Sequence, residues 1–188
     1  RIGTVDPKSN LTHKYNGKKY EAEIDKLPDH NAAMELVLKT LTDKELGVIS
    51  NLSEIGAVGH RVLHGGEKFT ASCLIDDACI AAIEENIPLG PLHNPANLMG
   101  IRACQAVLPN VPQVAVFDTA FHQTMPPKAF RYAIPNEYYT DLHIRKYGFH
   151  GTSHRYISAR AIELLKLPAG SKVIICHLGN GSSLSAIV

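Results

Sequence analysis

The chain has 188 residues, of which 45% are hydrophobic and 20% are charged, a composition typical of a folded globular protein rather than a disordered one. Its 19 Lys and Arg residues and 18 Asp and Glu residues give a net charge of +1, which argues against nucleic-acid binding by broad phosphate neutralisation and against a polybasic membrane-surface protein. It has no run of 18 apolar residues, no signal-peptide pattern and no C-x-x-C among its 4 cysteines. We therefore expect a cytoplasmic protein with reduced thiols and no membrane span.

The first half of the chain is predicted to begin with a hairpin and a helix. Asn16-Gly17 lies between two Tyr/Lys stretches and predicts a β-hairpin over 11–24, because a type I′ turn needs two positive φ angles. A helix is expected after Asp29 or Asn31, with an apolar face formed by Ala33, Leu36, Val37 and Leu41.

Strands and helices then alternate to the end of the chain. We expect strands over 57–63 and 112–118, and helices that start at Asp76 or Asp77, at Asn94-Pro95 and after Gly151. A strand, a glycine turn and a second strand follow over 172–188. This alternation indicates an α/β fold. Because the chain opens with Arg1 and stops at Val188 inside an apolar strand, we expect a fragment of a longer protein.

The first candidate site motif is His60-Arg-Val-Leu-His-Gly-Gly66, at the end of a predicted strand. Strand alternation puts Arg61 and Leu63 on one face and His60 and His64 on the other. A guanidinium on an apolar strand needs an anionic partner, which can be a bound carboxylate or phosphate or, alternatively, a structural acidic residue.

The second motif is Phe117-Asp-Thr-Ala-Phe-His122, at the C-terminal end of another predicted strand. Ligands of α/β sheets collect at this end of the strands, which makes Asp118 a candidate functional carboxylate. The alternative is an aspartate that forms a turn or caps a helix.

The third motif places His150 between Gly148 and Gly151 at a predicted helix start, where unpaired N–H groups suit an anion. The alternative is a buried core histidine, and His154 is expected to be structural. The fourth motif, His177-Leu-Gly-Asn-Gly181, is a glycine turn between two strands whose N–H groups could cradle a phosphate. Together the motifs supply the groups that phosphoryl transfer needs.

The amino-acid sequences of these stretches closely resemble those of the acetokinase family. The matching segments are GHRVLHGGEKF, PLHNPANLMGI, VAVFDTAFHQTMP, RKYGFHGTSHRY and CHLGNGSSLSAI, and they cover residues 56–188. The resemblance implies the duplicated α/β fold of sugar kinases, Hsp70 and actin, with an N-terminal domain over 1–119 and the beginning of a nucleotide-binding domain over 120–188. It also implies reversible transfer of the ATP γ-phosphoryl group to acetate, giving acetyl phosphate and ADP.

The resemblance assigns roles to particular residues. Asp118 and His150 are implied to be catalytic, and Arg61 is implied to hold the carboxylate or the phosphoryl group. The implied acyl pocket is lined by Leu63, Leu92 and Phe149, and the implied nucleotide-phosphate turn consists of His177, Leu178, Gly179, Asn180 and Gly181. Because acetate is already ionised at pH 7, we favour Asp118 as a residue that orients Arg61 or metal-bound water over Asp118 as a base.

Other implications concern the whole protein. The family's Mg²⁺ ligand, its second arginine and its opening Gly-Ser hairpin would lie outside this chain, so we expect no metal site within it and no activity from residues 1–188 alone. A homodimer is expected for the whole protein, with ATP and acetate as its small-molecule partners and neither nucleic acid nor membrane. The alternatives are a propionate or butyrate kinase of the same family, a metal-dependent hydrolase that uses the His60/His64 and His150/His154 pairs, and a non-catalytic nucleotide-binding module.

Overall fold

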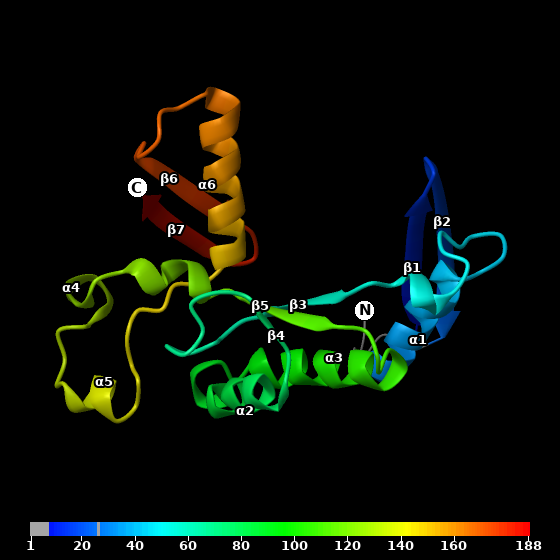
Figure 1. Cartoon of the computed structure of the whole chain (residues 1–188), viewed down its shortest axis with the longest axis horizontal. Coiled ribbons are helices and arrows are strands. Elements are labelled where there is room, and N and C mark those ends of the chain that lie inside the picture. Colours follow the sequence, from blue (N-terminus) through cyan, green and yellow to red (C-terminus); the bar gives the residue numbers. More distant parts are fainter. Residues whose placement is uncertain (1–7, 26) are drawn as a thin grey trace. The chain divides into compact units, whose positions relative to one another are not determined.

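The computed structural model describes residues 8–25 and 27–188 (Figure 1). The chain forms two compact units, one from residues 1–60 and 96–114 and the other from residues 61–95 and 115–188. These units are defined by contacts within the structure. The predicted division into domains at 119/120 concerns the architecture of the whole protein, and it stays a prediction.

The first unit begins with the predicted hairpin, formed by β1 (Lys8–Tyr15) and β2 (Lys18–Asp25). The strands are antiparallel, and Tyr15 lies opposite Lys18 at the turn. Asn16 and Gly17 have φ values of 45° and 73°, the two positive angles that the Asn-Gly pair predicts. The hairpin prediction is confirmed.

Helix α1 (His30–Leu41) follows, and it is capped by Asp29, whose side chain accepts a hydrogen bond from the Ala32 N–H at 2.9 Å. The predicted apolar face is wrong at Val37, which is 42% exposed, while its neighbour Leu38 is 7% exposed and belongs to the core. Residues 36–38 are three consecutive apolar residues, so the sequence pattern allowed either Val37 or Leu38 to belong to the buried face. A short 3₁₀ turn, η1 (Leu52–Glu54), precedes the central strands.

A three-stranded sheet has the strand order β3-β5-β4. Its strands are β3 (Val58–Val62), β4 (Cys73–Leu74) and β5 (Gln113–Phe117). The predicted strands at 57–63 and 112–118 are confirmed, and β5 has no exposed residue, so both of its faces are at least partly covered. The Asp118 N–H donates to the Val62 carbonyl at 2.9 Å, so the aspartate is fixed where both strands end.

Helices α2 and α3 begin close to the predicted positions. Asp76 caps α2 (Asp77–Glu85) by accepting from the Cys79 N–H at 2.7 Å, and α3 (Asn94–Val107) begins at the predicted Asn-Pro pair. The connecting segments contain short helical turns: η2 (Ile87–Leu89), η3 (Ala120–Thr124), α4 (Pro127–Phe130) and α5 (Glu137–Thr140).

The C-terminal part of the second unit is a helix packed on a hairpin. Helix α6 (Gly151–Leu165) lies beside the antiparallel pair β6 (Val173–Leu178) and β7 (Ser182–Ile187) (Figure 1). One face of the pair meets α6, whereas Ile174, Leu178 and Leu184 on the other face are 73%, 73% and 66% exposed. Within the described residues, no helix combines the length and the apolar character required to cross a membrane.

Candidate functional site

The predicted Arg61 and Asp118 meet at the ends of β3 and β5. Arg61 Nη2 donates to Asp118 Oδ2 at 2.6 Å, and Arg61 Nε donates to Asp118 Oδ1 at 3.3 Å. The Asp118 side chain is 1% exposed, whereas that of Arg61 is 58% exposed. The hydrogen bond from Arg61 to this carboxylate raises the pKa of the guanidinium. The buried acid therefore fixes a permanently charged group whose outer edge stays open to a ligand.

Asp118 also fixes the start of α6. Its Oδ2 accepts from the His150 N–H at 3.3 Å, and its backbone carbonyl accepts from the Gly151 N–H at 3.1 Å. A Cβ at position 151 would lie 2.2 Å from that carbonyl oxygen, so only glycine allows this approach. Asp118 therefore pairs with two of the N–H groups at the start of α6, one through its carboxylate and one through its backbone carbonyl. The expectation that this helix start binds an anionic ligand stays a prediction.

His150 has a left-handed backbone conformation, with φ 56° and ψ 27°, directly before α6. This conformation is costly for a residue other than glycine and is typical of functional sites. The imidazole stacks on that of His177, with ring centroids 4.1 Å apart and an interplanar angle of 17°. Burial lowers the pKa of His150, and the nearby His177, Arg61 and His93 act in the same direction, while Asp118 opposes them.

The Nδ1 atom of His150 is buried and has no hydrogen-bond partner within the part of the chain that the structure describes. A neutral imidazole in a cationic neighbourhood favours a negatively charged ligand, which would supply the missing counter-charge. His150 therefore lies where its imidazole would interact electrostatically with an anion held by Arg61.

Two serine–histidine contacts link α6 to the β6–β7 hairpin. Ser153 Oγ lies 2.9 Å from His177 Nδ1, and Ser183 Oγ lies 2.9 Å from His154 Nε2. His154 is fully buried, in agreement with the structural role expected for it. The contact to Ser153 orients the His177 ring that stacks on His150.

A pocket of about 320 Å³ opens beside this cluster, and it brings together Arg61, His150 and the three predicted acyl-pocket residues. Leu63 and Phe149 form part of its wall, and Leu92 is 86% exposed at its mouth. Sequence reasoning missed the remaining lining residues, which are Leu89, Gly90, Pro91 and His93. Pro91 and His93 flank Leu92 within the matching segment PLHNPANLMGI, and this adjacency was a signal that could have identified them.

The predicted phosphate turn is brought to the site only in part. His177 stacks on His150, but Leu178, Gly179, Asn180 and Gly181 lie at the exposed end of the hairpin and do not line the pocket. The Gly179 N–H donates to the Gly181 carbonyl at 2.9 Å. The turn is therefore a closed, solvent-facing loop.

Asn94 lies at the start of α3, as the sequence predicted, but its side chain also has a role that the sequence did not predict. It is fully buried. Its Oδ1 accepts from the His64 N–H at 3.1 Å, and its Nδ2 donates to the carbonyls of His64 and Ile83, both at 3.0 Å. One amide thus satisfies backbone groups at the end of β3 and the end of α2, and it fixes the segment that follows Arg61.

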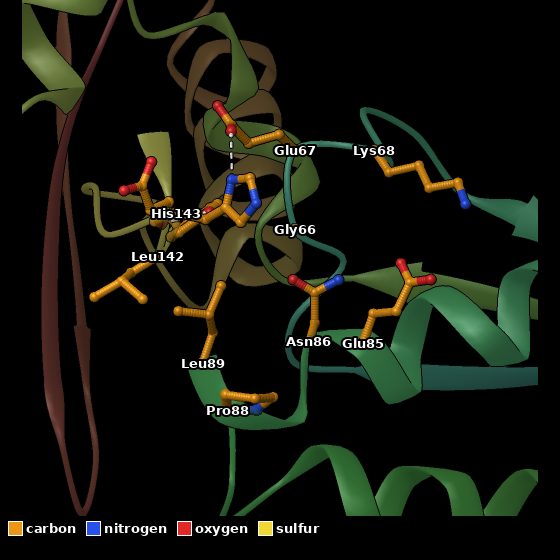
Figure 2. Close-up of a pocket in the computed structure, with 11 residues that line it drawn as sticks. Gly66, Glu67, Lys68, Glu85, Asn86, Pro88, Leu89, Leu142 and His143 are labelled. Carbon is orange, nitrogen blue, oxygen red and sulfur yellow. Dashed lines mark hydrogen bonds and ion pairs between the residues drawn. The ribbon is translucent and has the colours of Figure 1, made fainter. Parts of the chain in front are cut away.

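A second hollow of about 590 Å³ lies next to Glu67, which follows the Gly65-Gly66 pair (Figure 2). Glu67 accepts hydrogen bonds from the Arg145 guanidinium and, at 3.0 Å, from the Tyr139 hydroxyl. The dashed line in Figure 2 marks its 3.7 Å contact with His143 Nδ1. Arg145 in turn lies over the ring of Phe130 at 3.6 Å. Glu67 therefore ties the loop after Arg61 to the segment that leads to His150.

Replacing Glu67 with glutamine is expected to destabilise the protein by on the order of 3 kcal/mol, because the Arg145 side chain, 4% exposed, loses its counter-charge. Urea denaturation measures this change. Glu85→Gln, in the same hollow, is the matched control and should change stability by less than about 0.5 kcal/mol. Equal effects of the two substitutions would contradict the proposed role of Glu67.

His64 provides a pH-dependent prediction. It is 1% exposed, and its Nδ1 accepts from the Gly66 N–H at 3.1 Å. Burial lowers its pKa from 6.5 to about 4. Between pH 6.5 and pH 4, His64 is therefore protonated in the unfolded chain but not in the folded chain. Stability should therefore fall by about 3 kcal/mol as the pH drops from 6.5 to 4.

The measurement is urea denaturation at several pH values. His64→Asn, whose carbonyl oxygen can replace Nδ1 as the acceptor, should have a shallower pH dependence over this range. His30→Asn in the other unit is the control and should keep the original dependence. A pH dependence that is unchanged in His64→Asn would refute this assignment.

The described residues do not form a magnesium site by themselves. Across residues 8–25 and 27–188, no group of three or more His, Cys, Asp or Glu side chains could hold a metal ion. Asp118, which holds Arg61 but does not itself line the pocket, has both oxygens engaged by Arg61. The described residues around Arg61 therefore do not fit a metal centre by themselves.

Solved structures with the same fold define the class of protein. The chain superimposes on Porphyromonas gingivalis acetate kinase with a TM-score of 0.86 and 50% identity, covering 96% of this chain and 46% of that one. A propionate kinase from Francisella tularensis gives a TM-score of 0.82 and 45% identity, covering 90% of this chain and 42% of that one. The fold is therefore the kinase fold that the sequence predicted.

Sequence comparison identifies the family. Residues 3–188 match the Acetokinase family. Acetate kinases from Thermotoga maritima and Desulfitobacterium hafniense are 59% and 58% identical to this chain, over 95% and 100% of its length and 44% and 47% of their own. The chain belongs to the Acetokinase family, and it spans about half the length of these curated relatives.

Proposed function

We propose that the whole protein containing this chain catalyses the reversible transfer of the ATP γ-phosphoryl group to acetate, giving acetyl phosphate and ADP. The observation that carries this proposal is the Arg61 guanidinium, held by buried Asp118 at a small apolar pocket beside His150. A cation at the end of an apolar pocket suits a ligand with a short hydrocarbon part and one carboxylate. The acetate kinases among the relatives support the same reaction.

The reaction needs no general base. Acetate is ionised at neutral pH, so a carboxylate oxygen attacks the γ-phosphorus directly, a new P–O bond forms, and the bond to the β–γ bridging oxygen breaks. That oxygen leaves with ADP and its electron pair, and no proton moves. Asp118 is therefore a positioning residue that aims Arg61, and its own oxygens are already engaged.

Arg61 and His150 then stabilise charge during transfer. The transferring group spreads negative charge over three equatorial oxygens, and most of the catalysis comes from positioning and charge neutralisation. Arg61 supplies a fixed positive charge. His150 supplies an imidazole N–H, and its pKa, which burial lowers, rises when the anion arrives.

The acyl pocket sets the length of the acid. Leu63, Leu92 and Phe149 line it with Arg61, and one additional methylene is worth only about 1–3 kcal/mol of discrimination. Propionate is therefore a slow substrate in this proposal. The structural likeness to a propionate kinase makes propionate phosphorylation the second candidate function.

The remaining parts of the proposal concern the whole protein. Residues 177–181 contact the nucleotide phosphates, with Mg²⁺ held by groups outside this chain and by the nucleotide. The Mg²⁺ ion supplies charge neutralisation on the phosphates when bound. We also propose a cytoplasmic homodimer, by resemblance to the family.

The test supplies the whole protein with ATP, Mg²⁺ and acetate, with hydroxylamine as the trap for acetyl phosphate. Acyl hydroxamate should form in proportion to ADP, and propionate should give a lower kcat/KM than acetate. ADP release that is independent of acetate would overturn the proposal. A higher kcat/KM with propionate would favour the second candidate.

A further inference from the structure

Two free cysteines lie in contact where β4 is followed by α2. Cys73 is the first residue of β4, and Cys79 lies in the first turn of α2. Their Sγ atoms are 3.7 Å apart, with the Cys73 thiol oriented to donate to Cys79. Neither residue lines the Arg61 pocket, so the pair is separate from the proposed phosphoryl-transfer chemistry.

The geometry is close to that of a disulfide. An S–S bond of about 2.05 Å requires the two sulfur atoms to approach by about 1.6 Å. The connection between them is short, because only residues 74–78 separate the two cysteines. Asp76 within this connection accepts from the Cys79 N–H at 2.7 Å and caps α2. The cap holds Cys79 in place while the first thiol reacts.

The two thiols differ in access to solvent. Cys73 is partly exposed, whereas Cys79 is 2% exposed. An oxidant from solution therefore reaches Cys73 first, and Cys79 is positioned to react with the product. A partly exposed attacking thiol beside a resolving thiol is the arrangement of redox-sensitive cysteine pairs.

We propose that Cys73 and Cys79 form a redox-active dithiol that hydrogen peroxide oxidises to a reversible intramolecular disulfide. In the first step the Cys73 thiolate attacks a peroxide oxygen, the O–O bond breaks, and the hydroxide that leaves takes a proton to give water. In the second step Cys79 sulfur attacks the Cys73 sulfenic acid, the S–S bond forms, and the departing hydroxide takes the Cys79 proton. Two thiols are thus oxidised by two electrons, and one peroxide is reduced to two waters.

The surroundings of Cys79 control the second step. Burial raises the pKa of the Cys79 thiol to about 12, and the contact with Cys73 and the charge of Asp76 add to this effect, while Lys68 opposes it. Lys68 lies at the hollow shown in Figure 2. At neutral pH the Cys79 thiol therefore stays protonated, and disulfide closure should be slower than oxidation of Cys73 and should accelerate at alkaline pH.

The experiment treats the whole protein with hydrogen peroxide and analyses its tryptic peptides by mass spectrometry. Residues 69–102 form one tryptic peptide, which contains both cysteines, so closure appears as a loss of about 2 Da from that single peptide. Dithiothreitol should reverse the loss. Dimedone added with the peroxide at neutral pH should label Cys73 and reduce the amount of disulfide.

Substitutions distinguish the two roles. Cys79→Ser should abolish the 2 Da loss and increase dimedone labelling of Cys73, whereas Cys73→Ser should abolish both. Cys104→Ser, which removes a buried cysteine outside this peptide, is the matched control and should form the disulfide normally. Irreversible oxidation of Cys73 without closure, or a disulfide that joins two chains through the exposed Cys176, would overturn the proposal.

Discussion

Replacing Arg61 with alanine in the whole protein is expected to lower kcat/KM for acetate by about 10³-fold or more, which is the scale of an arginine that stabilises a transferring phosphoryl group. Arg61→Lys should recover only part of this loss, because an ammonium keeps the charge but lacks the planar fork that Asp118 holds. Steady-state kinetics with hydroxylamine trapping measures the effect.

Arg160→Ala is the control for Arg61→Ala. Arg160 pairs with Glu163 on the exposed face of α6, and its loss should leave kcat/KM within about 2-fold, since surface ion pairs contribute little. Guanidinium ion added to the Arg61→Ala variant should restore part of its activity. A fully active Arg61→Ala variant would mean that the Arg61–Asp118 pair is only structural.

Asp118→Asn is expected to lower kcat/KM by about 10²-fold, as is typical when a positioning group is misplaced. The amide can accept only one of the two Arg61 hydrogen bonds and turns an N–H group toward the guanidinium, so Arg61 and the start of α6 are less firmly held. Asp141→Asn, at an exposed position, is the control.

The pH dependence of the Asp118→Asn variant separates positioning from base catalysis. If Asp118 only positions Arg61, the variant should keep the shape of the original pH–rate profile at a lower rate. Disappearance of an acid limb from the profile would instead identify Asp118 as a proton acceptor.

Local sequence patterns predicted the helices and strands well, and they also predicted the face of the strand on which Arg61 lies. The Asn16-Gly17 turn needs two positive φ angles, and the burial of Val62 and His64 on either side of half-buried Leu63 confirms the strand alternation. These features depend on neighbouring residues, so they can be inferred without knowledge of the fold.

Contacts between distant residues could not be predicted in this way. Arg61 and Asp118 are 57 residues apart, and Glu67 and Arg145 are 78 residues apart. Sequence reasoning considered an acidic partner for Arg61 as an alternative to ligand binding, but the structure has a buried partner and an open edge on the same guanidinium. The two interpretations are therefore compatible.

The central claim is that a carboxylate oxygen of acetate attacks phosphorus in the Arg61 pocket. It is tested most directly by supplying the whole protein with ATP, Mg²⁺ and acetate labelled with ¹⁸O in both oxygens. In this account, ³¹P NMR of the acetyl phosphate shows the isotope shift of one ¹⁸O bonded to phosphorus, and Arg61→Ala forms this species far more slowly. Acetyl phosphate whose phosphorus carries no ¹⁸O would contradict the account.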